Sequence, residues 1–113
     1  ALAAAAAAIR RRGAEIIAAR GSSSAFSASN AAIGHVRSLI EKTPAGNWFS
    51  AAVPSDGSYG IEDGLIFSFP IVSDGAGGYS IVQGLPHSEF AKEKIARTLA
   101  ELQMERDVVK DLL

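Results

Sequence analysis

The sequence predicts an α+β domain made of two consecutive helices, a small antiparallel sheet of two or three strands, and a long C-terminal helix. Apolar residues recur at helical spacing in the first third and again near the end of the chain. Between them, strand-like runs alternate with glycine-rich turns. With 113 residues the chain is long enough for one domain of modest size. A sheet this small needs helices against one face to be stable.

The first predicted helix runs from Arg10 to Ala19, and Gly21 ends it. Its arginine triplet, residues 10–12, suits a solvated helix face. A phosphate-binding patch is the alternative, but no aromatic or further basic cluster supports it. The first eight residues hold seven alanines, which favour a helix but give it no apolar face. We therefore separate residues 1–9, a poly-alanine segment of uncertain identity, from residues 10–113.

Residues 20–32 carry almost no large side chain, and they lie where the first helix ends and the second begins. A serine hydroxyl can cap the second helix, and its free N–H groups would suit a negatively charged ligand. Small side chains equally allow a close helix crossing with no ligand, and the pattern leaves both interpretations open. The second helix should continue to about Lys42, with Ile33, Val36 and Ile40 facing the core.

Strand-like patterns follow from Trp48 to Val53 and from Leu65 to Val72. Pro70, inside the second pattern, predicts a bulge or an edge position because proline cannot donate to a sheet ladder. Residues 73–78 form a flexible glycine-rich hairpin connection into a last short strand, Tyr79–Val82. Together these patterns predict an antiparallel sheet of two or three strands.

The last helix begins after Ser88, a plausible N-cap, and Glu89 suits its first turn. Its apolar residues form one stripe, which consists of Ile95, Leu99, Leu102, Val109 and Leu113. The same stripe could belong to a partner-binding coiled coil. The repeat lasts fewer than three heptads, so packing against the chain's own sheet is the favoured interpretation.

Charge and composition exclude several functions. The net charge of −1 and the pI of about 6.1 give no reason to expect nucleic acid or an anionic membrane as a partner. No cysteine is present, which excludes a disulfide scaffold and a thiolate metal site. The alanine run is too short to span a bilayer and lacks a basic flank. A cytoplasmic location is the default expectation.

Few residues of this sequence suit catalysis. It contains no dinucleotide-binding glycine motif, phosphate-binding loop, zinc-protease motif or nucleophile elbow. His35 and His87 have no nearby carboxylate in sequence and are interpreted as surface histidines near or on helices. The carboxylates Asp56, Glu62 and Asp63 lie in turns, and no histidine or second cluster supports a metal role, so no metal site is predicted.

Several separate motifs, in the same order, resemble the C-terminal part of NAD-dependent malate dehydrogenases within the lactate/malate dehydrogenase family. They are residues 12–25 (RGAEIIAARGSSSA), 43–48 (TPAGNW), 55–61 (SDGSYGI), 64–70 (GLIFSFP) and 81–85 (IVQGL). The similarity is greatest to the branch that holds the cytosolic and many bacterial enzymes, and it covers nearly all of residues 10–113. The chain departs from the pattern at its serine triplet and at Phe26.

The resemblance implies that these residues are the C-terminal domain of an enzyme of the tricarboxylic acid cycle that interconverts malate and oxaloacetate with NAD. It implies a cytoplasmic homodimer whose Rossmann domain, catalytic histidine with its aspartate partner, and substrate-clamping arginines all come from preceding segments. No catalytic residue is therefore expected here, and the 113 residues alone should be inactive. By position, Ser24 matches the small residue that lines the substrate pocket, and Ala28 matches the residue near the nicotinamide ring.

Two alternatives stay open at this point. A relative that acts on lactate or another 2-hydroxy acid would share these motifs, because the discriminating residues lie in an upstream active-site loop. A stand-alone interaction module of helices and sheet, without activity, would account for the composition without any chemistry.

Overall fold

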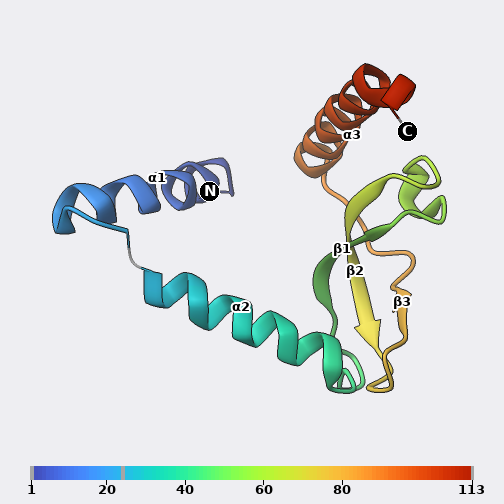
Figure 1. The fold of residues 1–113 in the computed structure, drawn as a ribbon, viewed down its shortest axis with the longest axis horizontal. Helices are drawn as coiled ribbons and strands as arrows, with labels where there is room; N and C mark the ends of the chain where they lie inside the picture. The colour runs from blue at the N-terminus through green and yellow to red at the C-terminus, as the bar shows by residue number, and fades with distance from the viewer. Residues whose placement is uncertain (1, 24, 113) are drawn as a thin grey trace. The chain divides into compact units, whose positions relative to one another are not determined.

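The computed structural model describes residues 2–23 and 25–112 and has the predicted α+β class (Figure 1). The chain divides into two compact units, Ala1–Ile40 and Glu41–Leu113. The first unit contains the helices α1 (Leu2–Arg20) and α2 (Ala25–Ile40). The second contains β1 (Phe49–Pro54), the 3-10 turn η1 (Ser58–Gly60), β2 (Ile66–Ser73), β3 (Tyr79–Ile81), α3 (Glu89–Val109) and the 3-10 turn η2 (Lys110–Leu112). Within the described residues no helix is long and apolar enough to cross a membrane.

Helix α1 is longer than predicted, since it begins at Leu2 and not at Arg10. Alanine has the highest helix propensity, so the alanine run continues the helix although it provides no apolar face. The predicted end is confirmed: Gly21 has a φ of +74°, and its N–H donates to the Ile17 carbonyl at 2.8 Å. This left-handed backbone conformation is favourable for glycine and is a common way for a helix to end.

Helix α2 ends at Ile40, two residues before the predicted end at Lys42. The prediction that Ile33, Val36 and Ile40 face the core is wrong for this chain, because they are 63%, 55% and 65% exposed. All of α2 is described, and none of its residues is buried. The helical spacing predicted correctly that these side chains share one face, but the described residues of the first unit do not bury it.

The three strands form one antiparallel sheet in the order β1-β2-β3 (Figure 1). Strand β2 is therefore central, and the prediction of an edge position or bulge around Pro70 is wrong. Pro70 pairs with Ser50 on the β1 side, while the ladder to β3 begins one residue later at Ile71. The central position is possible because the β3 ladder stops where proline would have to donate.

Tyr59 replaces the hydrogen bond that Pro70 cannot make. The Val82 N–H donates to the Pro70 carbonyl at 2.8 Å, but proline has no N–H to return to the Val82 carbonyl. The Tyr59 hydroxyl donates to that carbonyl instead, and it accepts from the Leu85 N–H at 3.3 Å. One side chain thus satisfies two backbone groups in the segment that joins β3 to α3.

We expect Tyr59→Phe to lower the free energy of unfolding by about 1–2 kcal/mol, because the Val82 carbonyl and the Leu85 N–H lose their partner. Amide hydrogen exchange should accelerate first at residues 82–87. Tyr79→Phe is the matched control, since Tyr79 lies at an exposed strand end and is 46% exposed. Equal effects of the two substitutions would contradict the role assigned to the Tyr59 hydroxyl.

The core of the second unit lies on one face of the sheet. Its buried apolar residues are Ala51, Val53, Ile61, Leu65, Phe69 and Ile71. Burial alternates along β1 and β2, so every second side chain enters the core, as the strand periodicity predicted. Ile95 and Leu99 of α3 pack against this cluster, which confirms that the helix stripe packs on the chain's own sheet at these two positions. Val109, further along the stripe, is 38% exposed, and Leu113 lies outside the described residues.

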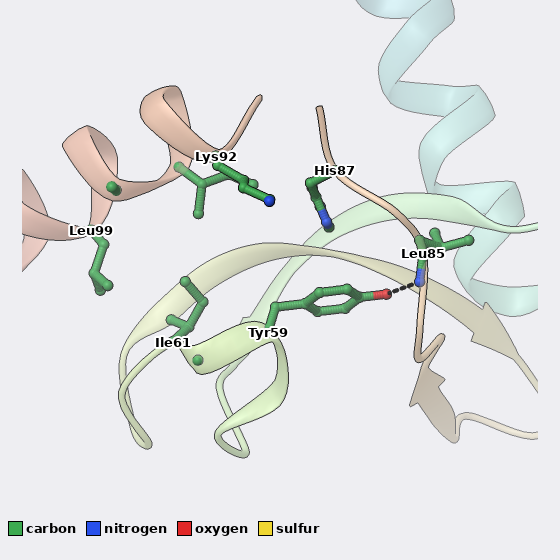
Figure 2. A pocket seen from close by; sticks show the side chains of 9 residues that line it. Tyr59, Ile61, Leu85, His87, Lys92 and Leu99 are labelled. Carbon is green, nitrogen blue, oxygen red and sulfur yellow. Dashed lines mark hydrogen bonds between the residues drawn. The ribbon is translucent and has the colours of Figure 1, made fainter. Parts of the chain in front are cut away.

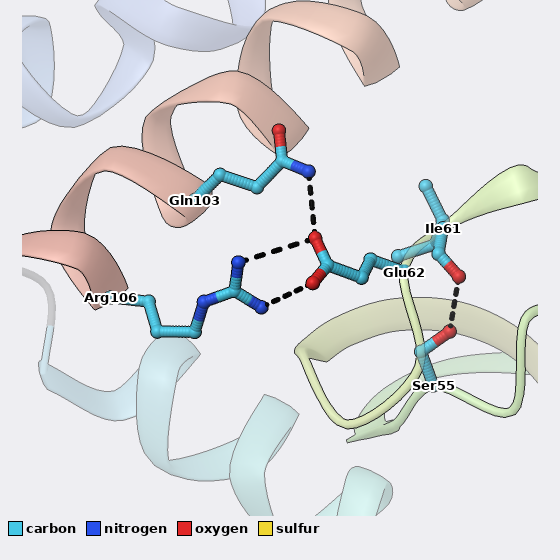
Figure 3. A network of polar contacts seen from close by, with 5 residues as sticks. All are labelled: Ser55, Ile61, Glu62, Gln103 and Arg106. Atoms are coloured by element: carbon cyan, nitrogen blue, oxygen red, sulfur yellow. Dashed lines mark hydrogen bonds and ion pairs between the residues drawn. The ribbon is translucent and has the colours of Figure 1, made fainter. Parts of the chain in front are cut away.

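Helix α3 begins as predicted: Ser88 is the N-cap, and its hydroxyl accepts from the Ala91 N–H at 3.2 Å. A polar network ties the second half of α3 to Glu62 (Figure 3). Arg106 donates to both oxygens of the Glu62 carboxylate, at 2.6 and 3.3 Å, and Gln103 donates to Glu62 Oε2 at 2.8 Å. These bonds lower the pKa of Glu62, with Arg106 as the largest cause. The sequence predicted Glu62 only as a turn carboxylate, so this tie to α3 is new.

Candidate functional site

The second unit has a cleft of about 510 Å³ between η1 and α3 (Figure 2). The residues that line it are Tyr59, Gly60, Ile61, Leu85, His87, Lys92, Ile95, Ala96 and Leu99. Most of this lining is apolar, with an imidazole, an ammonium group and a phenol hydroxyl added. A mostly apolar hollow of a few hundred Å³ with a few polar groups is the usual form of a small-molecule site.

Turn chemistry places Tyr59 along one side of the cleft. The preceding residues fold as the predicted turn: Ser58 N–H donates to Asp56 Oδ1 at 3.0 Å, and Gly57 N–H donates to Ser55 Oγ at 3.2 Å. Hydrogen bonds from the Ser58 side chain and, to a smaller extent, from the Ser58 N–H lower the pKa of Asp56. Tyr59 itself has a φ of +57°, which is uncommon for a residue with a side chain. Its ring stacks on Phe69, with centroids 6.4 Å apart, and this contact and the two hydroxyl hydrogen bonds hold it there.

His87 and Lys92 point toward the same end of the cleft (Figure 2). The His87 ring meets the Tyr59 ring edge-on, with centroids 5.1 Å apart and an interplanar angle of 77°. His87 is half-buried in the loop before α3, so the expectation of a surface histidine is wrong there. His35 lies on α2 and is exposed, as expected. Lys92, from the first turns of α3, pairs with Glu89 at 2.7 Å.

The lining suits binding better than catalysis. The Tyr59 hydroxyl already donates one hydrogen bond and accepts another, which leaves it poorly placed to transfer a proton. No serine, threonine or cysteine is among the nine lining residues, so they supply no aliphatic hydroxyl or thiol nucleophile beside a base. The chemistry available is contact with an apolar body and attraction of an anion by Lys92.

The two residues expected to line a ligand pocket belong to the first unit. Ser24 lies outside the described residues. Ala28 lies in the second turn of α2 and is exposed, so its small side chain is accessible. Nearby, the Ser29 hydroxyl donates to the Ala25 carbonyl at 3.0 Å and is engaged with its own helix.

The hairpin between β2 and β3 is a second polar feature, and it is structural. The Asp74 Oδ1 atom accepts from the N–H groups of Ala76 and Gly78, at 2.7 and 2.9 Å, and these bonds lower the pKa of Asp74. Thr43 ties the chain to the same hairpin, since its hydroxyl accepts from the Ser73 N–H at 2.8 Å. These contacts confirm the predicted turn and leave Asp74 engaged with the backbone.

Sequence reasoning missed the cleft because its residues come from three separate segments. Tyr59 lay within a quoted motif but was given no role, and His87 was considered only beside its sequence neighbours. One signal was available: a tyrosine between Gly57 and Gly60 in a turn, where an ordinary side chain is rarely found. A bulky residue in such a backbone position points to a role in packing or binding.

Three comparisons relate the chain to known proteins. The family pattern described as "lactate/malate dehydrogenase, alpha/beta C-terminal domain" matches residues 2–112. A malate dehydrogenase of Magnetococcus marinus is 55% identical over 105 residues, which cover 93% of this chain and 32% of that protein. The crystal structure of malate dehydrogenase from Naegleria fowleri has a TM-score of 0.79 and 42% identity, covering 94% of this chain and 32% of that one.

Lactate dehydrogenases are also similar in structure. The Trichomonas vaginalis lactate dehydrogenase in complex with NADH and oxamate has a TM-score of 0.75 and 32% identity, covering 92% of this chain and 32% of that one. In each case the chain spans about a third of the length of the relative that it matches.

Proposed function

Because this chain belongs to the lactate/malate dehydrogenase family as its α/β C-terminal domain, we propose that it works as part of a longer NAD-dependent malate dehydrogenase. The observation that carries the choice of malate is the 55% identity to a malate dehydrogenase. The preceding part of such an enzyme would hold NAD and supply the catalytic groups. This domain would contribute one wall of the substrate site and support its position.

Two residues near the start of the second helix, Ser24 and Ala28, are proposed for that wall. Ser24 would border the substrate and Ala28 would lie near the nicotinamide ring, and both side chains are small enough for a ligand to come close. The accessible Ala28 side chain agrees with this proposal.

A homodimer in the cytoplasm is proposed for the longer enzyme. The apolar face of α2, with Ile33, Val36 and Ile40 more than half exposed, would then be covered by the preceding domain or by a second subunit. Sedimentation of the longer polypeptide tests this. A species of one subunit mass at every concentration would rule out the dimer.

A relative that acts on lactate is the second candidate, favoured by the likeness to lactate dehydrogenase structures. The deciding experiment measures kcat/KM of the longer polypeptide with NADH and either oxaloacetate or pyruvate. Malate dehydrogenase activity requires a clear preference for oxaloacetate. A preference for pyruvate would assign the lactate reaction, and activity with neither would support a non-catalytic module.

We expect Ser24→Leu in the longer polypeptide to lower kcat/KM for oxaloacetate by about 10- to 100-fold. Overpacking a fitted site costs roughly 1–3 kcal/mol, and here the cost should fall on substrate placement. Ser29→Leu is the control, because it makes the same change five residues further along the chain, where no ligand contact is proposed. Normal kinetics for Ser24→Leu, or an activity loss that only follows its melting temperature, would make the serine cluster a packing feature.

A further inference from the structure

The cleft between η1 and α3 has an apolar end and a charged end. Ile61 and Leu99 lie at the apolar end (Figure 2), Ile95 adds to the apolar lining, and Ile61 belongs to the buried core itself. At the other end His87 and Lys92 point into the space above the Tyr59 ring (Figure 2). A ligand that fits both ends has an apolar body and a negative group.

The walls of this cleft are fixed before any ligand arrives. Tyr59 is held by hydrogen bonds to Val82 and Leu85, and its ring packs on Phe69. On the opposite side, the contacts from Glu62 to Gln103 and Arg106 hold the second half of α3 (Figure 3). Preformed walls reduce the entropy that binding must overcome.

The cation at the charged end can exchange its partner at little cost. Lys92 pairs with Glu89, but the two side chains are 60% and 89% exposed, and exposed ion pairs contribute little to stability. Glu89 does not line the cleft, whereas Lys92 does. An incoming carboxylate could therefore replace Glu89 as the partner of the Lys92 ammonium group.

From this arrangement we propose that the cleft binds a small carboxylate with an apolar body, such as an aryl or branched alkyl acid. The apolar body contacts Ile61, Ile95 and Leu99, and the carboxylate binds Lys92 Nζ beside the His87 ring. The site lies wholly within the unit Glu41–Leu113 and uses neither Ser24 nor Ala28. The proposal of this binding site therefore does not depend on the proposed dehydrogenase reaction.

The test uses the intact polypeptide and the probe 3-(4-fluorophenyl)propionate, with the corresponding uncharged amide for comparison. Fluorine NMR line broadening during titration reports the Kd without reference to enzyme activity. For a probe of this size we expect a Kd of about 1 mM, with the amide binding more weakly. Lys92→Gln should weaken carboxylate binding about two- to fivefold and leave amide binding unchanged, as the loss of one exposed ion pair predicts.

Lys94→Gln is the matched control. Lys94 lies on the same helix and carries the same charge, but it stacks over Phe90 and does not line the cleft. Ala96→Phe should abolish binding by filling the space, and its melting temperature shows whether the fold survives. The proposal is overturned if the probe does not saturate, if acid and amide bind equally, if Lys94→Gln matches Lys92→Gln, or if a folded Ala96→Phe still binds.

Discussion

The 113-residue chain alone is expected to form no NADH from malate, whereas the longer polypeptide should form it readily. The proposed enzyme holds NAD and its proton-transferring histidine in segments that precede this domain, and the cleft-lining residues here offer no substitute for them. Losing a general base alone lowers rates by about 100- to 10,000-fold, and losing the cofactor site as well should leave nothing above background.

The measurement follows absorbance at 340 nm with malate and NAD for both polypeptides, purified in the same way. The longer polypeptide is the positive control, and the shorter one carrying Ser24→Leu checks for contaminating host enzyme, because host activity would be unchanged by that substitution. The proposal that this domain needs the preceding segments for activity would be contradicted if malate-dependent NADH formation co-purified with the 113-residue chain through two different chromatographic steps.

Phe69→Ala should lower the free energy of unfolding of the second unit by about 3–5 kcal/mol, which removes most or all of the stability of so small a domain. Phe69 is 1% exposed in the central strand and contacts the rings of Tyr59 and Phe67. The substitution would leave a cavity beneath η1, where the two hydrogen bonds of the Tyr59 hydroxyl hinder that ring from moving into it.

Urea unfolding of the 113-residue chain, followed by the fluorescence of its single tryptophan, measures this loss. Trp48 precedes β1 and is half exposed, so it reports on the sheet. Ile66→Ala is the control on the same strand, because Ile66 is 57% exposed and should cost below about 1 kcal/mol. Similar unfolding midpoints for the two variants would mean that Phe69 is not central to the core.

Local pattern predicted most of the fold. The alternation along residues 65–72, the cap at Ser88 and the glycine after α1 each act within a few residues, so they can be read without knowing the tertiary structure. The predicted first and last residues of most elements differ from those in the structure by a few positions. The largest shift was in α1, where alanine propensity extends a helix that has no face to bury.

Features that depend on distant partners could not be predicted in this way. The lack of an N–H on proline predicted an edge strand for Pro70. The strand is central instead, because the hydroxyl of Tyr59, distant in sequence, donates to the Val82 carbonyl in place of that N–H. The cleft could not be predicted for the same reason, because Tyr59, His87 and Lys92 come close together only in the folded chain. For α2, periodicity identified an apolar face but not whether this chain covers it. Ser24 and Ala28 came from family resemblance, and their roles stay predictions.

The order of the strands in the sheet has a consequence for how a longer polypeptide would acquire its structure. Each strand pairs with the next one along the chain, so only short loops must close, and topologies dominated by such local pairings tend to fold quickly. The helices α1 and α2 bury no described apolar side chain fully and gain stability mainly when something covers them. In a longer polypeptide the sheet unit can therefore form from its own strand pairings, and α2 can complete its packing afterwards, when its apolar face is covered.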